Sequence, residues 1–285
     1  MRPAVGWIGL GAIGAPMAKR ALDAGFALSV WARRSGQADA LVAAGARRCA
    51  DPESLARACE LVVTIVGGPD DVDALHRRTM ASARPGTLFV DLTTAAPLTA
   101  ARSAERAASR ACSVVDAPGT GGVAGAVRGS LTAFAGGEPD AIERARPLLE
   151  TFCQRIVRAG GNGAGYRMKL VNQTIVAGVL LGLARGGALA RAGGFDAATL
   201  RGALGHGTAS GFLFDSYIER MIDGGGPVTF TLGLFRKDLR LARDEARERG
   251  LATAFLDFAL DAVDAARSRH GDAAGVQVLA LADPG

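Results

Sequence analysis

Short apolar runs alternate with helical patterns through the first half of this chain. The strand-like runs are residues 5–8, 27–31, 61–66, 88–91, 113–116 and 131–135, and the helical patterns between them include 16–24, 37–44, 52–58 and 99–111. Strands that alternate with helices of this length form βαβ units, and right-handed crossovers leave few topologies open to them. We therefore predict an α/β fold in which a doubly wound parallel sheet is covered on both faces.

The pattern changes at the glycine-rich segment "RAGGNGAGYR", residues 158–167. A long helical stretch, 168–191, follows it, and residues 196–203, 210–222, 234–249 and 253–268 also show helical patterns, with no convincing strand among them. We therefore predict an N-terminal α/β domain over 1–161 and an all-α C-terminal domain over 162–285, joined by a long interdomain helix.

Charge and cysteine content exclude several classes of function. The formal net charge is +5, but segments such as "RKDLRLARDEARERG" mix both signs, which is typical of a solvated helix face and argues against nucleic-acid binding. The most apolar stretch, 175–183, is too short to span a bilayer, so we expect no membrane association. Four widely spaced cysteines and three histidines predict a cytoplasmic protein with reduced thiols and no metal site.

The segment "GLGAIG" follows the first predicted strand and opens the first predicted helix. Its residues are Gly9, Leu10, Gly11, Ala12, Ile13 and Gly14. In this context, the first glycine permits a tight turn, the second lets the backbone approach a pyrophosphate, and the third lets helix and strand pack closely. The segment predicts a dinucleotide site on a Rossmann-type domain.

The end of the second predicted strand discriminates between the two nicotinamide dinucleotides. An NAD site usually has an Asp or Glu here to accept from the ribose 2′-hydroxyl, whereas this chain has Ala32, Arg33, Arg34 and Ser35. Guanidinium groups form charge-assisted hydrogen bonds to phosphate. The sequence therefore favours NADP over NAD.

Three further segments carry residues suited to chemistry. "VDLTTAAP" (90–97) ends a strand, "DAPGTGGVAGAVRGSLTAFAGG" (116–137) places small residues after the next strand, and "GAGYRMKLVNQ" (163–173) places Lys169 early in the long helix. Small residues at 120–122 let consecutive backbone N–H groups form a concave site for a carboxylate.

Together these segments resemble the β-hydroxyacid dehydrogenase family, which includes 3-hydroxyisobutyrate dehydrogenase and tartronate semialdehyde reductase. The family patterns G-x-G-x-M/I-G, D-A-P-V-S-G-G-x-x-G-A-x-x-G-x-L-T, G-x-G-x-x-x-K-x-x-N-N and K-D-L-x-L-A have counterparts here in order, the last at 237–242. The resemblance implies Lys169 as the catalytic proton donor and acceptor. It also implies substrate contacts from Thr120, Gly121, Gly122, Asn172 and Gln173, and further cofactor contacts from Val66, Gly67, Thr94 and Lys237.

The chain departs from the family pattern at positions close to the substrate. Thr120 replaces the usual serine, Gly119 the preceding valine and Gln173 the usual asparagine. We expect an NADP-preferring oxidoreductase that interconverts a small anionic β-hydroxy acid and its semialdehyde or oxo acid between the two domains of a homodimer or homotetramer. The alternatives are an imine reductase on the same scaffold, which typically lacks the lysine, and a non-catalytic dinucleotide-binding protein. We expect His76 and His270 to be surface residues.

Overall fold

The computed structural model describes residues 2–34 and 36–281. The chain divides into two compact units, Met1–Lys169 and Leu170–Gly285.

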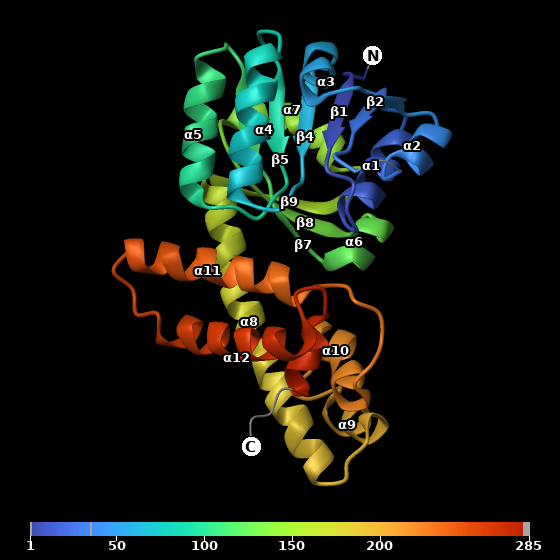
Figure 1. Cartoon of the computed structure of the whole chain (residues 1–285), viewed down its shortest axis with the longest axis vertical. Helices are drawn as coiled ribbons and strands as arrows, with labels where there is room; N and C mark the ends of the chain where they lie inside the picture. The colour runs from blue at the N-terminus through green and yellow to red at the C-terminus, as the bar shows by residue number, and fades with distance from the viewer. Residues whose placement is uncertain (1, 35, 282–285) are drawn as a thin grey trace. The chain divides into compact units, whose positions relative to one another are not determined.

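The first unit is built on one mixed sheet that is parallel over most of its width (Figure 1). Its strands run in the order β3-β2-β1-β4-β5-β6-β8-β7, with β9 paired to β8. The bounds are β1 (Val5–Ile8), β2 (Leu28–Trp31), β3 (Arg47–Arg48), β4 (Leu61–Thr64), β5 (Leu88–Asp91), β6 (Ser113–Asp116), β7 (Gly119–Thr120), β8 (Leu131–Gly136) and β9 (Cys153–Gly160). The strands β1 to β6 pair in parallel, which confirms the doubly wound sheet.

The sheet extends beyond its predicted strands. β8 runs antiparallel to β6 and β7 and parallel to β9. The sequence did not predict β3, β7 or β9. β3 and β7 have only two residues each, which is too short to show a periodic pattern. β9 is largely exposed and carries polar and charged side chains among its apolar ones, so it gives no apolar period-2 signal either.

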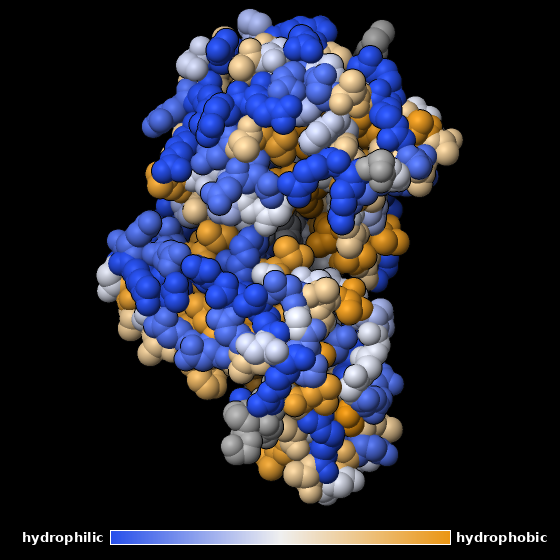
Figure 2. All heavy atoms as spheres, in the orientation of Figure 1, coloured by the Kyte–Doolittle hydropathy of each residue, from blue (hydrophilic) through white to orange (hydrophobic). Residues whose placement is uncertain are grey.

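Helices cover the parallel part of the sheet, and the chain supplies their start signals. They are α1 (Gly14–Asp23), α2 (Asp39–Ala43), α3 (Pro52–Ala58), α4 (Pro69–Ser82), α5 (Pro97–Ala108), α6 (Gly122–Arg128) and α7 (Pro139–Leu149). Proline occupies the first turn of α3, α4, α5 and α7, where its missing N–H costs no helix hydrogen bond. The outward faces of α4 and α5 are largely hydrophilic (Figure 2). The core beneath α4 and α5 includes Val62, Met80, Phe89 and Ala107, whereas Trp7, Val30, Val63 and Val90 belong to a separate cluster with residues of α1 and α7.

The second unit is helical, as predicted. α8 (Ala164–Ala192) begins in the first unit and continues into the second, which also contains α9 (Ala197–Leu204), α10 (Phe212–Asp223), α11 (Leu232–Glu248), α12 (Ala254–His270) and the 3₁₀ helix η1 (Val276–Ala280). Its core joins buried residues of α8, α10, α11, α12 and η1. Within the described residues, β pairing in this unit is limited to an isolated bridge between Thr231 and Gly275.

α8 is longer than its sequence suggested. The helix begins at Ala164, one turn before the predicted start at residue 168. By length and composition alone it could cross a membrane, although a core helix passes the same test. Leu170, Ala177 and Leu180 are buried in the core of the second unit, whereas 33% of the apolar window as a whole is buried.

Candidate active site

The register of the parallel strands brings the predicted cofactor residues to one edge of the sheet. Ile8 is aligned with Trp31 on one side and Thr64 on the other, and Thr64 is aligned with Asp91. The segments that follow these four residues therefore leave the sheet side by side. From β1 the chain first continues to β2 and β3 on one side and then returns to β4 on the other side. Doubly wound sheets bind nucleotides at the point where the strand order changes direction in this way.

The three glycines of the first turn have different local constraints. Gly9 has φ +104°, and a Cβ there would lie 1.9 Å from the carbonyl oxygen of Ile65. A Cβ on Gly14 would lie 2.2 Å from the carbonyl oxygen of Gly9. Gly11 is exposed, and a Cβ on it would meet no atom within 4 Å. Gly9 and Gly14 are thus required by the fold, whereas Gly11 leaves open space for a ligand beside Leu10, Ala12 and Ile13.

Two exposed arginines follow β2 at the same edge. Arg33 is 80% exposed, and its guanidinium lies 3.6 Å from the Asp71 carboxylate, which is itself 41% exposed. Exposed pairs of this kind contribute little to stability. Arg34 is also exposed and Ala32 is half-buried, while Ser35 lies outside the described residues. Both guanidinium groups can therefore reach an anionic ligand at low cost.

The next two loops along this edge carry the other predicted cofactor residues. The backbone N–H of Val66 donates to the Thr93 hydroxyl at 3.0 Å, which ties the loop after β4 to the loop after β5. A Cβ on Gly67 would lie 2.5 Å from a carboxylate oxygen of Asp71. Thr94 is half-buried in the loop after β5.

Lys169 is anchored to the segment that follows β6. Its side chain is 9% exposed, and Nζ donates to the carbonyl oxygen of Gly119 at 2.8 Å. Gly119 immediately precedes Thr120, and both form β7 with the antiparallel strand β8. The structure thus places the ammonium group at the predicted substrate loop.

The substrate loop continues through two glycines in left-handed conformations. Gly121 has φ +123° and Gly122 has φ +65°. Non-glycine residues rarely adopt either conformation, and a Cβ on Gly121 would also lie 3.0 Å from the Leu131 side chain. The backbone turn that presents successive N–H groups therefore depends on glycine at both positions.

In the second unit, the predicted amide residues form a polar cluster with α11. Gln173 Nε2 donates to Asp238 Oδ2 at 2.7 Å, and Asn172 Nδ2 donates to Gln173 Oε1 at 2.8 Å. Lys237 Nζ lies 2.9 Å from Asp238 Oδ1. Both polar atoms of the Gln173 side chain are therefore engaged within this unit.

The expectation that His76 is a surface residue is wrong. His76 is 1% exposed; its Nδ1 lies 2.8 Å from the Ser103 hydroxyl and its Nε2 lies 3.2 Å from the Thr64 hydroxyl. Burial lowers the pKa of the imidazole, and the nearby Asp91 carboxylate opposes that shift in part. The error arises because α4 is amphipathic, and the histidine occupies its buried face beside Phe89.

A buried carboxylate that the sequence did not single out lies at the end of β6. Asp116 is 1% exposed, and its two oxygens accept from the backbone N–H groups of Gly163 at 2.8 Å and Tyr166 at 2.9 Å. Burial raises the pKa of the Asp116 carboxyl to about 7; the two N–H donors oppose this shift, and the Asp91 charge adds to it. The available signal was a carboxylate ending an otherwise apolar buried strand.

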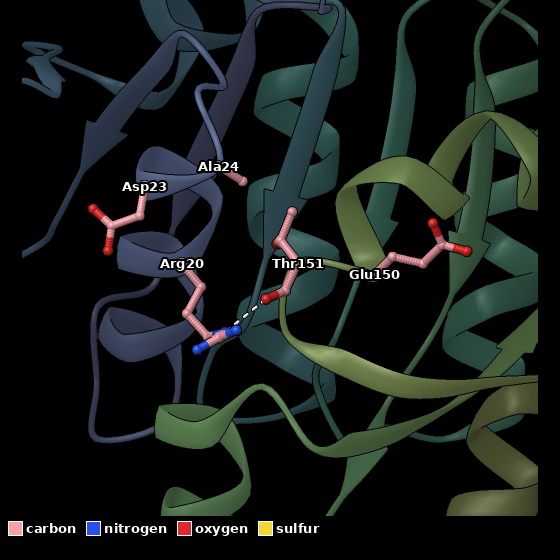
Figure 3. Close-up of a pocket in the computed structure, with 5 residues that line it drawn as sticks. All are labelled: Arg20, Asp23, Ala24, Glu150 and Thr151. Atoms are coloured by element: carbon pink, nitrogen blue, oxygen red, sulfur yellow. Dashed lines mark hydrogen bonds between the residues drawn. The ribbon is translucent and has the colours of Figure 1, made fainter.

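A separate surface pocket contains none of the predicted site residues. It is lined by Arg20, Asp23, Ala24, Glu150 and Thr151 (Figure 3). Arg20 Nε donates to the carbonyl oxygen of Thr151 at 2.6 Å, so this arginine joins α1 to the segment after α7.

Two family models together cover nearly the whole chain. Residues 4–161 match the NAD-binding domain of 6-phosphogluconate dehydrogenase, and residues 163–281 match the model described as NAD-binding of NADP-dependent 3-hydroxyisobutyrate dehydrogenase.

Individual proteins show the same relationship. An NAD-dependent L-serine dehydrogenase of Pseudomonas aeruginosa is 32% identical over 270 residues, which are 90% of this chain and 89% of that protein. The structure of Mycobacterium tuberculosis 3-hydroxyisobutyrate dehydrogenase with L-serine aligns with a TM-score of 0.88 at 25% identity, covering 99% of both chains. An imine reductase of Streptomyces aurantiacus aligns with a TM-score of 0.66 at 26% identity, covering 99% of this chain and all of that one.

The higher TM-score and the sequence matches favour the dehydrogenases over the imine reductases. The chain belongs to the β-hydroxyacid dehydrogenase family and is an NAD(P)-dependent oxidoreductase of small β-hydroxy acids.

Proposed function

We propose that Lys169 is the general acid and base of this dehydrogenase. In carbonyl reduction, the ammonium group donates a proton to the substrate oxygen, and in hydroxy acid oxidation the neutral amine accepts it. The observation that carries this proposal is the anchored Nζ, which lies 2.8 Å from the Gly119 carbonyl oxygen at the start of the glycine loop.

The glycine loop suits the carboxylate of the substrate. Thr120 supplies a hydroxyl, and the left-handed turn at Gly121 and Gly122 supplies backbone N–H groups. A carboxylate held by this loop would place the β-carbon, which bears the hydroxyl or carbonyl group two bonds from the carboxylate carbon, within reach of Lys169. Asn172, Gln173 and Lys237 remain predicted contacts from the second unit.

The edge after β1, β2 and β4 fits a dinucleotide. Open space at Gly11 admits a pyrophosphate close to the backbone, and α1 presents its N-terminal N–H groups and partial positive charge there. A bound nicotinamide supplies or accepts the hydride. Of the two cofactors we infer NADP, because Arg33 and Arg34 stand where a ribose-binding carboxylate would select NAD.

Removing both arginines is expected to reverse the cofactor preference. Charge-assisted hydrogen bonds to phosphate are worth roughly 1.5–3 kcal/mol each, so Arg33→Ala with Arg34→Ala should raise KM for NADPH roughly 10- to 100-fold. KM for NADH should change less than about twofold, since NADH lacks the 2′-phosphate. Steady-state kinetics with both cofactors checks this.

The matched control is Arg110→Ala, an exposed arginine that precedes β6 at its other end. It should leave both KM values unchanged. An equal rise in KM for NADPH and for NADH in the double variant would contradict the assignment of the 2′-phosphate site.

The substrate class is a small β-hydroxy acid or the corresponding semialdehyde or oxo acid. The related proteins are named for L-serine and 3-hydroxyisobutyrate, so both belong in a panel with other small hydroxy acids, semialdehydes and cyclic imines. Turnover of hydroxy acids or semialdehydes supports the proposal. Turnover of imines alone would replace it with the imine reductase alternative.

We also infer a cytoplasmic homodimer or homotetramer. α8 exposes Val171, Ile175 and Val179, which lie at spacings of four residues and form one apolar stripe beside Gly178 and Gly182. Such a stripe is suited to close packing against a second copy of the helix. Sedimentation equilibrium should give two or four times the 29.1 kDa chain mass, and Ile175→Glu should shift it toward one chain mass.

A further inference from the structure

The segment after β6 holds the first two turns of α8 at two points. Asp116, the last residue of β6, accepts from the N–H groups of Gly163 and Tyr166. Three residues later, the carbonyl oxygen of Gly119 accepts from Lys169 Nζ. Residues three apart share a helix face, so Tyr166 and Lys169 lie on the side of α8 that faces this segment.

Asp116 fills a specific need of the helix. The first N–H groups of an α-helix have no partner within the helix and are usually satisfied by a side chain just before it. The residue before α8 is Gly163, with φ +90°, which has no side chain to offer. The Asp116 carboxylate supplies both acceptors from a strand 47 and 50 residues away in sequence.

Two glycines keep the helix and the carboxylate in contact. A Cβ on Gly165 would lie 2.3 Å from the carbonyl oxygens of Asp116 and Phe134. A Cβ on Gly136 would lie 2.6 Å from the backbone nitrogen of Gly165 and 2.8 Å from Asp116 Oδ2. The backbones therefore approach too closely for any larger residue, and the first turn of α8 has little freedom to shift.

We propose that Asp116 is a positioning residue for hydride transfer: its ionised carboxylate holds the first turn of α8 so that Lys169 stands at the substrate loop. A carboxylate accepts from both N–H groups equally. A neutral carboxyl carries a hydroxyl oxygen, which is a weaker acceptor and brings a proton that needs its own partner. Protonation therefore loosens one of the two backbone anchors. The role ascribed to Lys169 rests on the proposed function above.

The surroundings of Asp116 determine how it titrates. Asp91 faces it from β5, and the side chain of Tyr166, from α8, hydrogen-bonds Asp91. From β8, Gly136 pairs with Asp116 in the antiparallel register and carries no titratable side chain. Burial raises the pKa of Asp116 to about 7 and raises the pKa of Tyr166 well above its usual value. A pKa of about 7 places the charge change of Asp116 near neutral pH.

The direction of the pH effect separates Asp116 from Lys169. In the reduction direction, Lys169 must be protonated, so its titration lowers the rate only as pH rises. Loss of rate as pH falls through about 7 is therefore the expected signature of Asp116. For wild-type reduction, a plot of log kcat against pH should be level above about pH 7 and should fall as the pH decreases below about 7.

The test variant is Asp116→Asn, with Asn162→Ala as the matched control. Asn162 Nδ2 donates to the carbonyl oxygen of Val114 at 2.9 Å, so the control removes an uncharged bond between the same loop and the same strand. At pH 8, Asp116→Asn should lower kcat roughly 10- to 100-fold. Its KM for NADPH should stay within about twofold, and the primary isotope effect with nicotinamide-deuterated NADPH should rise.

The bend near pH 7 should be absent in Asp116→Asn and present in Asn162→Ala. A variant with wild-type kcat and an unchanged bend would overturn the proposal, as would a loss of kcat in Asn162→Ala equal to that in Asp116→Asn.

Stability should change with pH in the opposite sense to activity. A carboxyl group whose folded pKa is raised favours the folded state below its unfolded pKa of about 4, and that contribution is lost as pH rises through about 7. The difference in Tm between Asp116→Asn and wild type should therefore be more favourable to the variant at pH 8 than at pH 5. A residue with only a structural role would lower Tm and kcat together.

A measurement on the wild-type protein applies even where Asp116→Asn does not fold. The amide proton resonances of Gly163 and Tyr166 should titrate with a common inflection near pH 7, whether or not a substrate is known. Resonances that stay constant from pH 5.5 to 8.5 would overturn the proposal. Because this readout is independent of turnover, failure of the proposed function leaves it interpretable.

Discussion

Replacing Lys169 with alanine is expected to lower kcat for carbonyl reduction roughly 10²- to 10⁴-fold, the range in which a positioned proton donor contributes. The alanine has no group to protonate the substrate oxygen as negative charge develops on it. KM for NADPH should remain within about twofold, because the glycine turn and the arginines after β2 are unaffected. Stopped-flow measurement of NADPH oxidation separates the hydride step from cofactor binding.

Controls distinguish this role from a general effect of a lost charge. Lys19→Ala removes an exposed lysine on α1 that pairs with Asp23, and it should leave kcat unchanged. Added methylamine should restore part of the activity of Lys169→Ala by entering the vacated space. If Lys169→Ala retained wild-type turnover, the proposed mechanism would be wrong. Another group at the substrate loop would then have to donate the proton.

Substitutions in the glycine turn after β1 give the second large effect. Alanine at Gly9 should lower the stability of the fold, whereas alanine at Gly11 should weaken cofactor binding. Gly9→Ala places a methyl group 1.9 Å from the carbonyl oxygen of Ile65 in a left-handed backbone conformation. The expected loss in free energy of unfolding is roughly 2–4 kcal/mol. Chemical denaturation without cofactor measures it directly.

Gly11→Ala should leave the free energy of unfolding unchanged, because its methyl group would meet no atom within 4 Å. It should instead raise the Kd for NADPH roughly 10- to 100-fold, as expected for a methyl group that obstructs a pyrophosphate at a cost of roughly 1–3 kcal/mol. Fluorescence titration with NADPH provides the measurement.

Gly202→Ala, on exposed α9, also meets no atom within 4 Å and should alter neither quantity by much. NADPH binding by Gly11→Ala as tight as in wild type would show that the cofactor does not approach this turn.

Local signals in the sequence were sufficient for most of the parallel sheet and for the helical second unit. β1, β5 and β6 begin and end at the residues that the apolar runs predicted. Buried strands and amphipathic helices carry their periodicity in adjacent residues, so a short window reveals them. The glycine turn was readable because its three glycines lie within six residues, although the carbonyl oxygen that excludes a side chain at Gly9 belongs to Ile65.

Contacts between distant segments were less predictable. β9 pairs with β8 although most of its residues are exposed, and β8 reverses direction relative to β6. His76 turns inward because Ser103 and Thr64 satisfy its ring nitrogens. Each of these depends on a partner that no short window contains.

The candidate site shows the same division. Arg33, Arg34 and the glycine turn were chosen from residue type and motif, and Lys169 was chosen from the resemblance to the family. Their residue types state the chemistry directly: an amine moves a proton, guanidinium groups bind phosphate, and glycine admits a close approach. The sequence by itself therefore determined the reaction class and the family.

Only the tertiary structure decided how that chemistry is held in place. Asp116 reaches α8 across 47 to 50 residues, and Gln173 reaches Asp238 across 65. Both carboxylates are buried, and a buried charge is tolerated only where folding delivers hydrogen-bond donors to it. Such donors come from strands and helices brought together by packing, and local sequence carries no record of which backbone N–H will face which carboxylate.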